Sequence, residues 1–382
     1  MLVCGILFLV GVGGCVGLAS WFWHGLSESG VMPKVAPSEV LTGTPLAWRQ
    51  LDTMLSFGPF PDKLLVGDFE GDGDDELLYV ADDDFGTKLF EVSGASQQLS
   101  GYQRNRITQF ISWDYDRNGV TELVRSDLTA AFEELQPVVI EVNTHTLGRL
   151  EQVTPKVEEM RTGDVDGDGY AELLSVAPDN PTLLALGKLG QNVWLCKLVP
   201  VISVVGDIDG DKRDEIILPD TQNFDTWWID GVDEERHRLP AQAIQTPLCA
   251  ADLDADGLAE VIGLARVDQP YAEGQPVYSQ LAIWNPATTE TSYTQRYEEP
   301  GGWAFYDDPW LAAVDIYADG RNELAWVPGG DEYGSELYIA KADGTLVYRE
   351  RVGALVSAMR VAQAAGKQHL VLLTRRRLLV WP

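Results

Sequence analysis

The 382-residue sequence is poor in basic side chains, with 28 Lys and Arg against 59 Asp and Glu, so its formal net charge is −31. Nucleic-acid binding needs a Lys- or Arg-rich face to neutralise phosphates, and the sequence offers none. The single basic run, residues 375–377, lies beside the last predicted strand and is interpreted as a solvated edge. We therefore expect no nucleic-acid partner.

Cysteine and histidine are also scarce, with four of each. Two cysteines lie in the apolar N-terminus, and we expect Cys196 and Cys249 to stay free because the predicted fold holds them too far apart. The histidines are scattered, and no nucleophile elbow, zinc pair or phosphate-binding glycine loop is present. We therefore expect a non-enzymatic protein without a disulfide framework.

What the sequence has in abundance is one acidic loop, which occurs six times. The copies begin at Asp68 (DFEGDGDDEL), Asp114 (DYDRNGVTEL), Asp164 (DVDGDGYAEL), Asp207 (DIDGDKRDEI), Asp252 (DLDADGLAEV) and Asp315 (DIYADGRNEL). Oxygen-bearing side chains recur at positions 1, 3 and 5, and Glu stands at position 9. Such spacing lets carboxylates converge on a hard cation, and Ca²⁺ accepts about 6–8 oxygens. Gly at position 6 in five copies supplies a sharp turn, with Lys212 as the exception.

We predict about six structural Ca²⁺ ions, one in each loop. The predicted metal sets, which include the residue at position 7, are Asp68, Glu70, Asp72, Asp74 and Glu76 in loop one; Asp114, Asp116, Asn118, Val120 and Glu122 in loop two; Asp164, Asp166, Asp168, Tyr170 and Glu172 in loop three; Asp207, Asp209, Asp211, Arg213 and Glu215 in loop four; Asp252, Asp254, Asp256, Leu258 and Glu260 in loop five; and Asp315, Asp319, Arg321 and Glu323 in loop six. Loop six has the fewest acidic ligands, with Tyr317 at position 3, and should bind most weakly. A filled ligand shell leaves little room for substrate, so we expect no catalysis at these loops.

The sequence around the loops separates two kinds of calcium site. An EF-hand needs Glu at position 12 between two helices, whereas position 12 here is Tyr, Arg, Ser, Leu, Gly or Trp. The flanks, such as KLLVG and ELLYV, are typical of strands. Over residues 45–382 the chain resembles the FG-GAP/VCBS repeats of integrin-type β-propellers. That resemblance implies a nine-residue calcium loop between the first two strands of each blade.

The spacing of the loops predicts the number of blades. Successive first positions differ by 46, 50, 43, 45 and 63 residues, a period typical of propellers. A decayed seventh copy without carboxylates starts at Val361 and keeps Gly366 at position 6. We predict an all-β, seven-bladed propeller over residues 44–382, whose last blade takes its outer strand from residues 45–52. Six blades and a disordered tail are the alternative.

The N-terminus predicts a membrane anchor. Residues 1–23 carry no charged side chain and end in an aromatic stretch, which fits one transmembrane helix followed by a linker at 24–43. Two alternatives stay open: a signal peptide cleaved after Ala19, and lipidation at Cys15 within VGGC. All three place the propeller on the extracytoplasmic side.

The longest spacing, between Asp252 and Asp315, marks a candidate partner surface. Its link contains the aromatic cluster Trp303, Phe305, Tyr306 and Trp310, flanked by acidic pairs. Aromatic anchors with a polar rim favour protein interfaces, although the cluster could also stack on carbohydrate or fold back against the propeller. The sequence therefore favours an interaction or assembly subunit of a membrane complex. A polysaccharide-binding lectin or polysaccharide-degrading enzyme is the alternative.

Overall fold

The computed structural model describes residues 48–52, 63–80, 87–92, 96–98, 107–128, 135–140, 149–152, 159–177, 180–187, 192–197, 204–219, 226–230, 236–239, 244–265, 277–294, 297–299, 311–328, 330–331, 334–352, 356–374 and 377–381. All of them belong to the compact unit Ser38–Pro382. The predicted anchor, linker and aromatic cluster at 303–310 lie outside these residues. Within them, no helix is long and apolar enough to cross a membrane.

Every regular element in the described part is a β-strand, which confirms the all-β prediction. The strands form antiparallel sheets, numbered here along the chain. Sheet one holds β2 (Lys63–Gly67), β3 (Glu76–Val80), β4 (Thr87–Glu91) and β5 (Ser96–Gln98); sheet two holds β6 (Ile107–Trp113), β7 (Glu122–Leu128), β8 (Leu135–Ile140) and β9 (Arg149–Gln152). Sheet three holds β10 (Glu159–Gly163), β11 (Glu172–Ala177), β12 (Asn180–Leu186) and β13 (Asn192–Lys197); sheet four holds β14 (Val204–Gly206), β15 (Glu215–Pro219), β16 (Thr226–Ile229) and β17 (Arg236–Arg238).

The remaining sheets depart slightly from this four-strand order. Sheet five holds β18 (Ile244–Ala251), β19 (Glu260–Ala265), β21 (Leu281–Trp284) and β22 (Thr291–Tyr293), and sheet six holds β24 (Leu311–Val314), β25 (Glu323–Trp326), β26 (Gly330–Asp331), β27 (Gly334–Ala340) and β28 (Leu346–Val352). Sheet seven holds β29 (Val356–Ala364), β30 (Lys367–Thr374), β31 (Leu378–Val380) and β1 (Arg49–Asp52). A separate two-stranded ribbon pairs β20 (Val277–Ser279) with β23 (Tyr297–Glu299).

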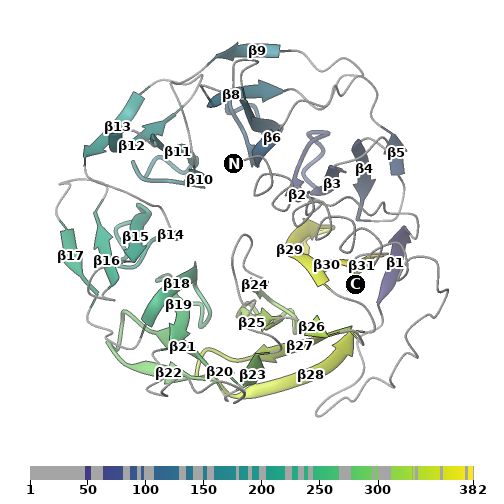
Figure 1. Ribbon diagram of the computed structural model, residues 1–382, viewed down its shortest axis with the longest axis vertical. Helices are drawn as coiled ribbons and strands as arrows, with labels where there is room; N and C mark the ends of the chain where they lie inside the picture. The colour runs from purple at the N-terminus through teal and green to yellow at the C-terminus, as the bar shows by residue number, and fades with distance from the viewer. Residues whose placement is uncertain are drawn as a thin grey trace, which may run out of the picture. The chain divides into compact units, whose positions relative to one another are not determined.

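The sheets are arranged radially around a centre (Figure 1). Their first strands, β2, β6, β10, β14, β18, β24 and β29, lie innermost, and each contacts the first strand of the next sheet. The series closes because β29 contacts β2. The first strands therefore form an unbroken ring.

The core lies between neighbouring sheets, because their middle strands are buried on both faces. The second strands β15, β19 and β25 are almost entirely buried, and they are short apolar runs rather than alternating patterns. One cluster joins Leu77 of sheet one to Val371 of sheet seven, and another joins Leu174 of sheet three to Ile216 of sheet four. These hydrophobic layers between neighbouring sheets fix the positions of the loops at the ends of the strands. Cys249 is free.

Sheet seven is built from both ends of the described chain. β1 pairs antiparallel with β31, in the register Arg49↔Val380, Gln50↔Leu379 and Asp52↔Leu378. The indole Nε1 of Trp48, just before β1, donates to Glu350 of sheet six over 3.1 Å. The N-terminal strand therefore covers the edge that β31 would otherwise expose.

The decayed seventh copy differs from the predicted loop. β29 runs on to Ala364, and β30 begins at Lys367, so only Ala365 and Gly366 turn the chain. Both have positive φ, 51° and 71°, as in the tight turns that suit two-residue hairpins. Without carboxylates to gather the backbone N–H groups, this segment pairs as strands instead of forming a loop.

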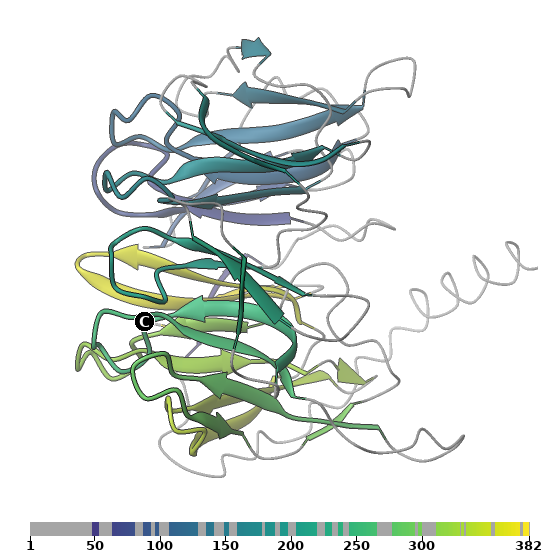
Figure 2. The ribbon, with the colours of Figure 1, turned by 90° about the vertical axis from the view of Figure 1, so that its left-hand side faces the viewer.

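Part of the chain between the fifth and sixth loops forms the β20–β23 ribbon. β20 leads into β21, and β23 follows β22, so the ribbon extends the third and fourth strands of sheet five. This connection puts the ribbon at the end of the sheet opposite the acidic loop. The acidic loops themselves lie along one face, at the left of Figure 2.

Candidate metal centre

The aspartate at position 1 folds each acidic loop around its own carboxylate. In loop three, Asp164 Oδ1 accepts the N–H groups of Gly167 (2.8 Å) and Asp168 (3.1 Å), and Oδ2 accepts that of Gly169 (2.8 Å). The bond from position 6 recurs in the other five loops. Position 6 always has a positive φ, which Gly adopts freely and Lys212, at 72°, adopts against its steric preference.

The glutamate at position 9 opens the second strand and is at most 4% exposed in every loop. One of its oxygens, Oε2, accepts the backbone N–H of position 2 at 2.7–3.1 Å in all six loops. This bond fixes the side chain and leaves Oε1 for another partner. A buried, immobilised carboxylate at this point is what a cation site needs and what an ordinary surface loop lacks.

In five loops the carboxylates converge. One oxygen from each of three residues lies within 4.8 Å of the others in the sets Asp68, Asp72 and Glu76; Asp114, Asp116 and Glu122; Asp164, Asp166 and Glu172; Asp207, Asp209 and Glu215; and Asp252, Asp254 and Glu260. Loop six provides no such set among the described residues. Its position 3 is Tyr317, which is 55% exposed and brings no carboxylate.

Loop four tests whether these residues fit a metal ion. Glu215 is fully buried, and its Oε1 has no hydrogen-bond partner in the described part of the structure. An unpaired buried carboxylate is costly, and a bound cation removes that cost. Burial, and then the charges of Asp209 and Asp207, raise the pKa of Glu215 to about 8. The donor set, all carboxylate oxygen, suits Ca²⁺.

Four of the other position-9 glutamates also have a raised pKa. Burial, the largest cause in each case, raises the pKa of Glu76, Glu172 and Glu260 to about 7 and that of Glu323 to about 6. Neighbouring loop carboxylates add to the increase. These loops therefore favour an added positive charge, and among them loop six favours it least.

In three of the loops, the residue directly after the third strand changes the electrostatic environment of the carboxylates. Asp230 follows β16, and its charge adds to the burial that raises the pKa of Asp209. Asn285 follows β21, and its Nδ2 donates to Asp254 (3.1 Å) and Glu260 (2.7 Å). Lys341 follows β27 and opposes the rise in the pKa of Glu323. The electrostatic demand for a cation thus falls from loop four to loop six.

Position 8 joins each loop to the one before it. The residue at position 8 bonds the backbone of position 1 in the preceding loop, in the pairs Thr121–Asp68, Asp214–Asp164, Ala259–Asp207, Asn322–Asp252 and Gln368–Asp315, at 2.7–2.8 Å. The Ala171 carbonyl instead accepts the indole N–H of Trp113 at 2.7 Å. Asp75, at position 8 of loop one, completes the circle through Gln363 of the β29–β30 hairpin. The backbone N–H of Asp75 donates to the Gln363 carbonyl, and Asp75 Oδ2 accepts the Gln363 N–H, both at 2.7 Å.

Position 7, included in the predicted metal sets, has a different role for its side chains. Val120, Arg213 and Leu258 pack against the position-4 glycine of the preceding loop. Asp74 Oδ1 accepts the N–H of Ala365, 2.7 Å away. These side chains therefore link neighbouring loops.

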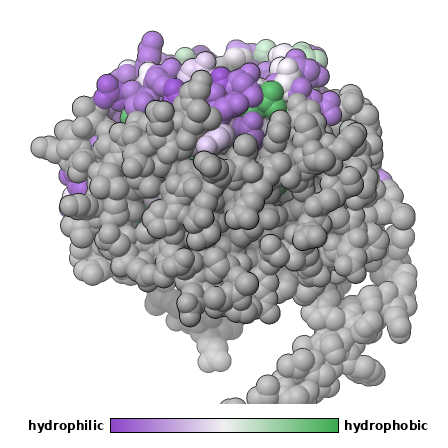
Figure 3. All heavy atoms as spheres, turned by 90° about the horizontal axis from the view of Figure 1, so that it is seen from above, coloured by the Kyte–Doolittle hydropathy of each residue, from purple (hydrophilic) through white to green (hydrophobic). Residues whose placement is uncertain are grey.

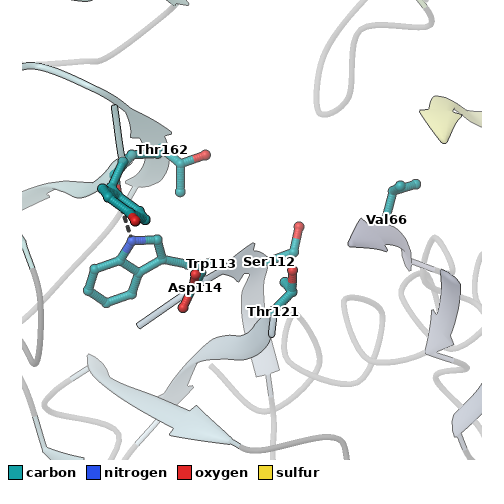
Figure 4. A pocket seen from close by; sticks show the side chains of 8 residues that line it. Val66, Ser112, Trp113, Asp114, Thr121 and Thr162 are labelled. Carbon is teal, nitrogen blue, oxygen red and sulfur yellow. Dashed lines mark hydrogen bonds between the residues drawn. The ribbon is translucent and has the colours of Figure 1, made fainter. Parts of the chain in front are cut away.

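A small hollow lies beside loops two and three (Figure 4). It has a volume of about 170 Å³ and is lined by Trp113, Tyr170, Asp114 and small side chains including Thr121 and Thr162. That volume is below the several hundred Å³ usual for small-molecule sites. The described residues that are visible from the edge of the molecule are mostly hydrophilic (Figure 3). The predicted partner cluster at Trp303, Phe305, Tyr306 and Trp310 lies outside the described residues.

Comparison with known proteins identifies the fold and not a family. No family of known sequences matches the chain, and no curated protein matches it. Among solved structures, BBS1N, crystallised in complex with ARL6DN, has a TM-score of 0.59 at 12% identity, covering 89% of this chain and 98% of that one. The WD40 domain of Toxoplasma gondii coronin has a TM-score of 0.54 at 13% identity, covering 91% and 86%.

A third similar structure is a lectin from Agrocybe aegerita that recognises non-reducing terminal N-acetylglucosamine, with a TM-score of 0.50, 12% identity and 85% coverage of both chains. At such low identities the likeness extends to the fold alone. With the radial sheets, it shows that the chain is a β-propeller.

Sequence reasoning found the loops and missed two parts of the site. Position 8 varies among Asp, Thr, Ala, Asn and Gln, and three of its bonds to position 1 use side chains, so no residue type marked it. Asn285 lies 25 residues from Glu260, and only the sheet brings the two together. A signal was available for Asp230, Asn285 and Lys341, because each is a polar residue directly after an apolar third strand.

Proposed function

We propose that this chain is a seven-bladed, calcium-stabilised β-propeller of the FG-GAP/VCBS type that serves as a non-catalytic interaction or assembly subunit. The ring of seven first strands supports the blade count, as does the circle of position-8 bonds through the β29–β30 hairpin. The pairing of β1 with β31 supports closure of the last blade by residues 45–52. Sheet seven is then the one blade without a metal.

The observation that carries the calcium proposal is the unpartnered, fully buried Oε1 of Glu215 within a converging carboxylate set. Bound Ca²⁺ would supply two positive charges at each loop. Position 1 shapes the loop, position 3 or 5 contributes an outer carboxylate, and position 9 a buried one. Because position 8 bonds the preceding loop, an ion that fixes one loop also fixes its neighbour.

The proposed interaction role rests on the surface features that could bind a partner or a substrate. The described residues that line the hollow include one carboxylate, Asp114, whereas glycoside hydrolysis uses a pair. The hollow therefore does not favour the polysaccharide-degrading alternative. We propose that residues 1–23 anchor the propeller on the extracytoplasmic side of a membrane and that residues 303–310 contact a protein partner.

Calcium removal tests the structural part of the proposal. Any ion that binds the folded loops and not the unfolded chain stabilises the protein by RT ln(1 + [L]/Kd), about 2.7 kcal/mol per site at 100 times Kd. The full-length chain, purified in mild detergent, should melt several degrees lower in EGTA than in millimolar Ca²⁺, while Mg²⁺ should restore less. Equal melting temperatures in EGTA and Ca²⁺ would refute it.

Co-purification tests the assembly role. The tagged chain is extracted from membranes with detergent, and stable integral-membrane partners are expected to elute with it. Replacing Trp303, Phe305, Tyr306 and Trp310 together by Ala should release them and leave the calcium-dependent melting unchanged. Isolation only as a monomer would contradict an assembly role.

A further inference from the structure

Loop three is unlike the other loops because a side chain of the protein already supplies a cation to it. Arg117 stands at position 4 of loop two, and its guanidinium reaches across to loop three. There Nη2 lies 2.9 Å from Glu172 Oε1, and Nη1 bonds Asp168 Oδ2. The guanidinium also lies over the ring of Tyr170, 4.8 Å from its centroid.

The contact with Glu172 is largely removed from solvent, whereas the Asp168 side chain is 38% exposed. The Arg117 side chain is 17% exposed, and that of Glu172 is fully buried. Charge-assisted hydrogen bonds with little exposure are among the stronger polar contacts in proteins. An ion pair on a solvated surface contributes almost nothing to stability, and the buried Arg117–Glu172 contact differs from such a pair.

Comparison with loop four shows what Arg117 replaces. Glu172 and Glu215 are equivalent: both stand at position 9, both are fully buried, and both use Oε2 to accept the N–H of position 2. The remaining oxygen is unpartnered in Glu215 and bonded to Arg117 in Glu172. The guanidinium therefore supplies to Glu172 the positive charge that a metal ion would supply to Glu215 in loop four.

Only loop two can reach its neighbour in this way. Position 4 is Gly71, Gly167, Gly210, Ala255 and Ala318 in the other acidic loops, none with a side chain that extends to the next loop. Arg117 holds this position with a φ of 58°, which is unfavourable for a residue other than Gly.

We propose that Arg117 is a built-in cation that closes loop three and competes with Ca²⁺ for Glu172 and Asp168, so that the six loops are not equivalent. The inference rests on the proposed calcium function. Ca²⁺ in loop three would require the oxygens that Arg117 holds, and two cations cannot share them without repulsion. Loop three therefore binds Ca²⁺ more weakly than loop four, and binding there moves Arg117 off Tyr170, a wall of the hollow.

The first test measures stability in the full-length chain with Arg117→Gln. Lys367→Gln is the matched control, because it removes one positive charge at an exposed residue of the β29–β30 hairpin, where Lys367 makes no ion pair with the described residues. In EGTA, Arg117→Gln should melt several degrees below the unaltered protein and Lys367→Gln should not. In millimolar Ca²⁺ the deficit of Arg117→Gln should disappear, because the ion takes the place of the guanidinium.

The second test counts ions by equilibrium dialysis and elemental analysis over a range of free Ca²⁺. Arg117→Gln should bind one more Ca²⁺ per chain than the unaltered protein at low free Ca²⁺. The affinity of that site should rise at least about tenfold, equivalent to about 1.4 kcal/mol. Arg117→Lys, which keeps the charge but loses the planar fork, should give an intermediate affinity.

The outcomes separate the two proposals. If the unaltered protein binds Ca²⁺ and Arg117→Gln gains neither an ion nor a larger calcium-induced shift in melting temperature, the role of Arg117 is wrong and the calcium function stands. If neither protein binds Ca²⁺, both proposals fail. A destabilised Arg117→Gln that Ca²⁺ does not rescue also overturns the role, because Arg117 would then be a packing residue only.

Discussion

At the scale of single residues, the acidic loops show how a buried carboxylate takes on different partners in one repeated frame. Glu172 bonds Arg117, Glu260 bonds Asn285, and Oε1 of Glu215 bonds nothing in the described structure. The position-9 glutamate is the same residue in the same register each time. Its neighbour decides whether the loop needs an external cation.

Glu215 predicts a pH dependence for the protein in EGTA. Its pKa rises from the usual 4.5 to about 8 on folding, so between those values the folded chain holds a proton that the unfolded chain has lost. The stability associated with that proton is present below pH 4.5 and is lost as the pH rises through about 8. The melting temperature in EGTA should therefore fall from about pH 5 to pH 8.

Glu215→Gln provides the control for this prediction. The variant removes the titrating group, so its melting temperature in EGTA should change less over the same pH range. It should also bind one Ca²⁺ fewer than the unaltered chain. An unchanged pH profile, followed by circular dichroism, would show that Glu215 does not carry the charge conflict.

At the scale of strands and loops, the close approach of neighbouring sheets limits which residues can precede a loop. Gly206 ends β14 directly before loop four, and a Cβ there would lie 2.7 Å from Cβ of Ala250 and 3.3 Å from Cβ of Ala259. Ala259 is the position-8 residue that bonds loop four. The small side chains on both sides therefore allow the two loops to meet.

Gly206→Ala should lower the free energy of unfolding by about 1–3 kcal/mol, as expected for an overpacked contact. Urea unfolding of the full-length chain in Ca²⁺ measures the change. Adding Ala250→Gly removes the closest atom, so the double variant should be more stable than the sum of the two single effects predicts. Strict additivity would mean that the two positions do not touch.

The elements show how far the sequence alone reaches. Apolar runs around each DxDxDG segment predicted first and second strands, because alternation between an apolar run and an acidic loop is a local pattern. The hairpin at Ala365–Gly366 was not foreseen, since a nine-residue match in register suggested a loop. The structure of this segment depends on whether carboxylates or a neighbouring strand accept the hydrogen bonds of its backbone N–H groups. The pairing of neighbouring strands depends on the tertiary structure, which the local sequence does not specify.

At the scale of the whole unit, the ends of the described chain meet in sheet seven. The regular spacing of the loops allowed a prediction of the ring, whereas the contact from Arg117 to loop three depends on how close neighbouring sheets stand. That distance is set by packing across the ring and cannot be read from a local sequence pattern. The charge of Arg117 at position 4, where the other loops have Gly or Ala, is the one local feature that could have suggested the contact.

Removing β1 tests the closure of sheet seven. A chain that begins at residue 53 loses the three register pairs of β1 with β31, while a chain that begins at residue 38 keeps them. At about 1 kcal/mol for each ladder hydrogen bond, the loss should be a few kcal/mol. The shorter chain should also form oligomers through the exposed edge of β31, visible by light scattering. Equal stability of the two chains would contradict closure by β1.

The same strand has a mechanical consequence. Residues 1–47 precede β1, so any force applied through them enters the ring at β1 and is resisted first by its short pairing with β31 and by the Trp48–Glu350 contact. A pull along the strands loads the pairing in shear, which shares the load among all its bonds, whereas a pull across them opens the bonds one at a time. The direction of tension would then decide whether the ring holds or opens at this seam.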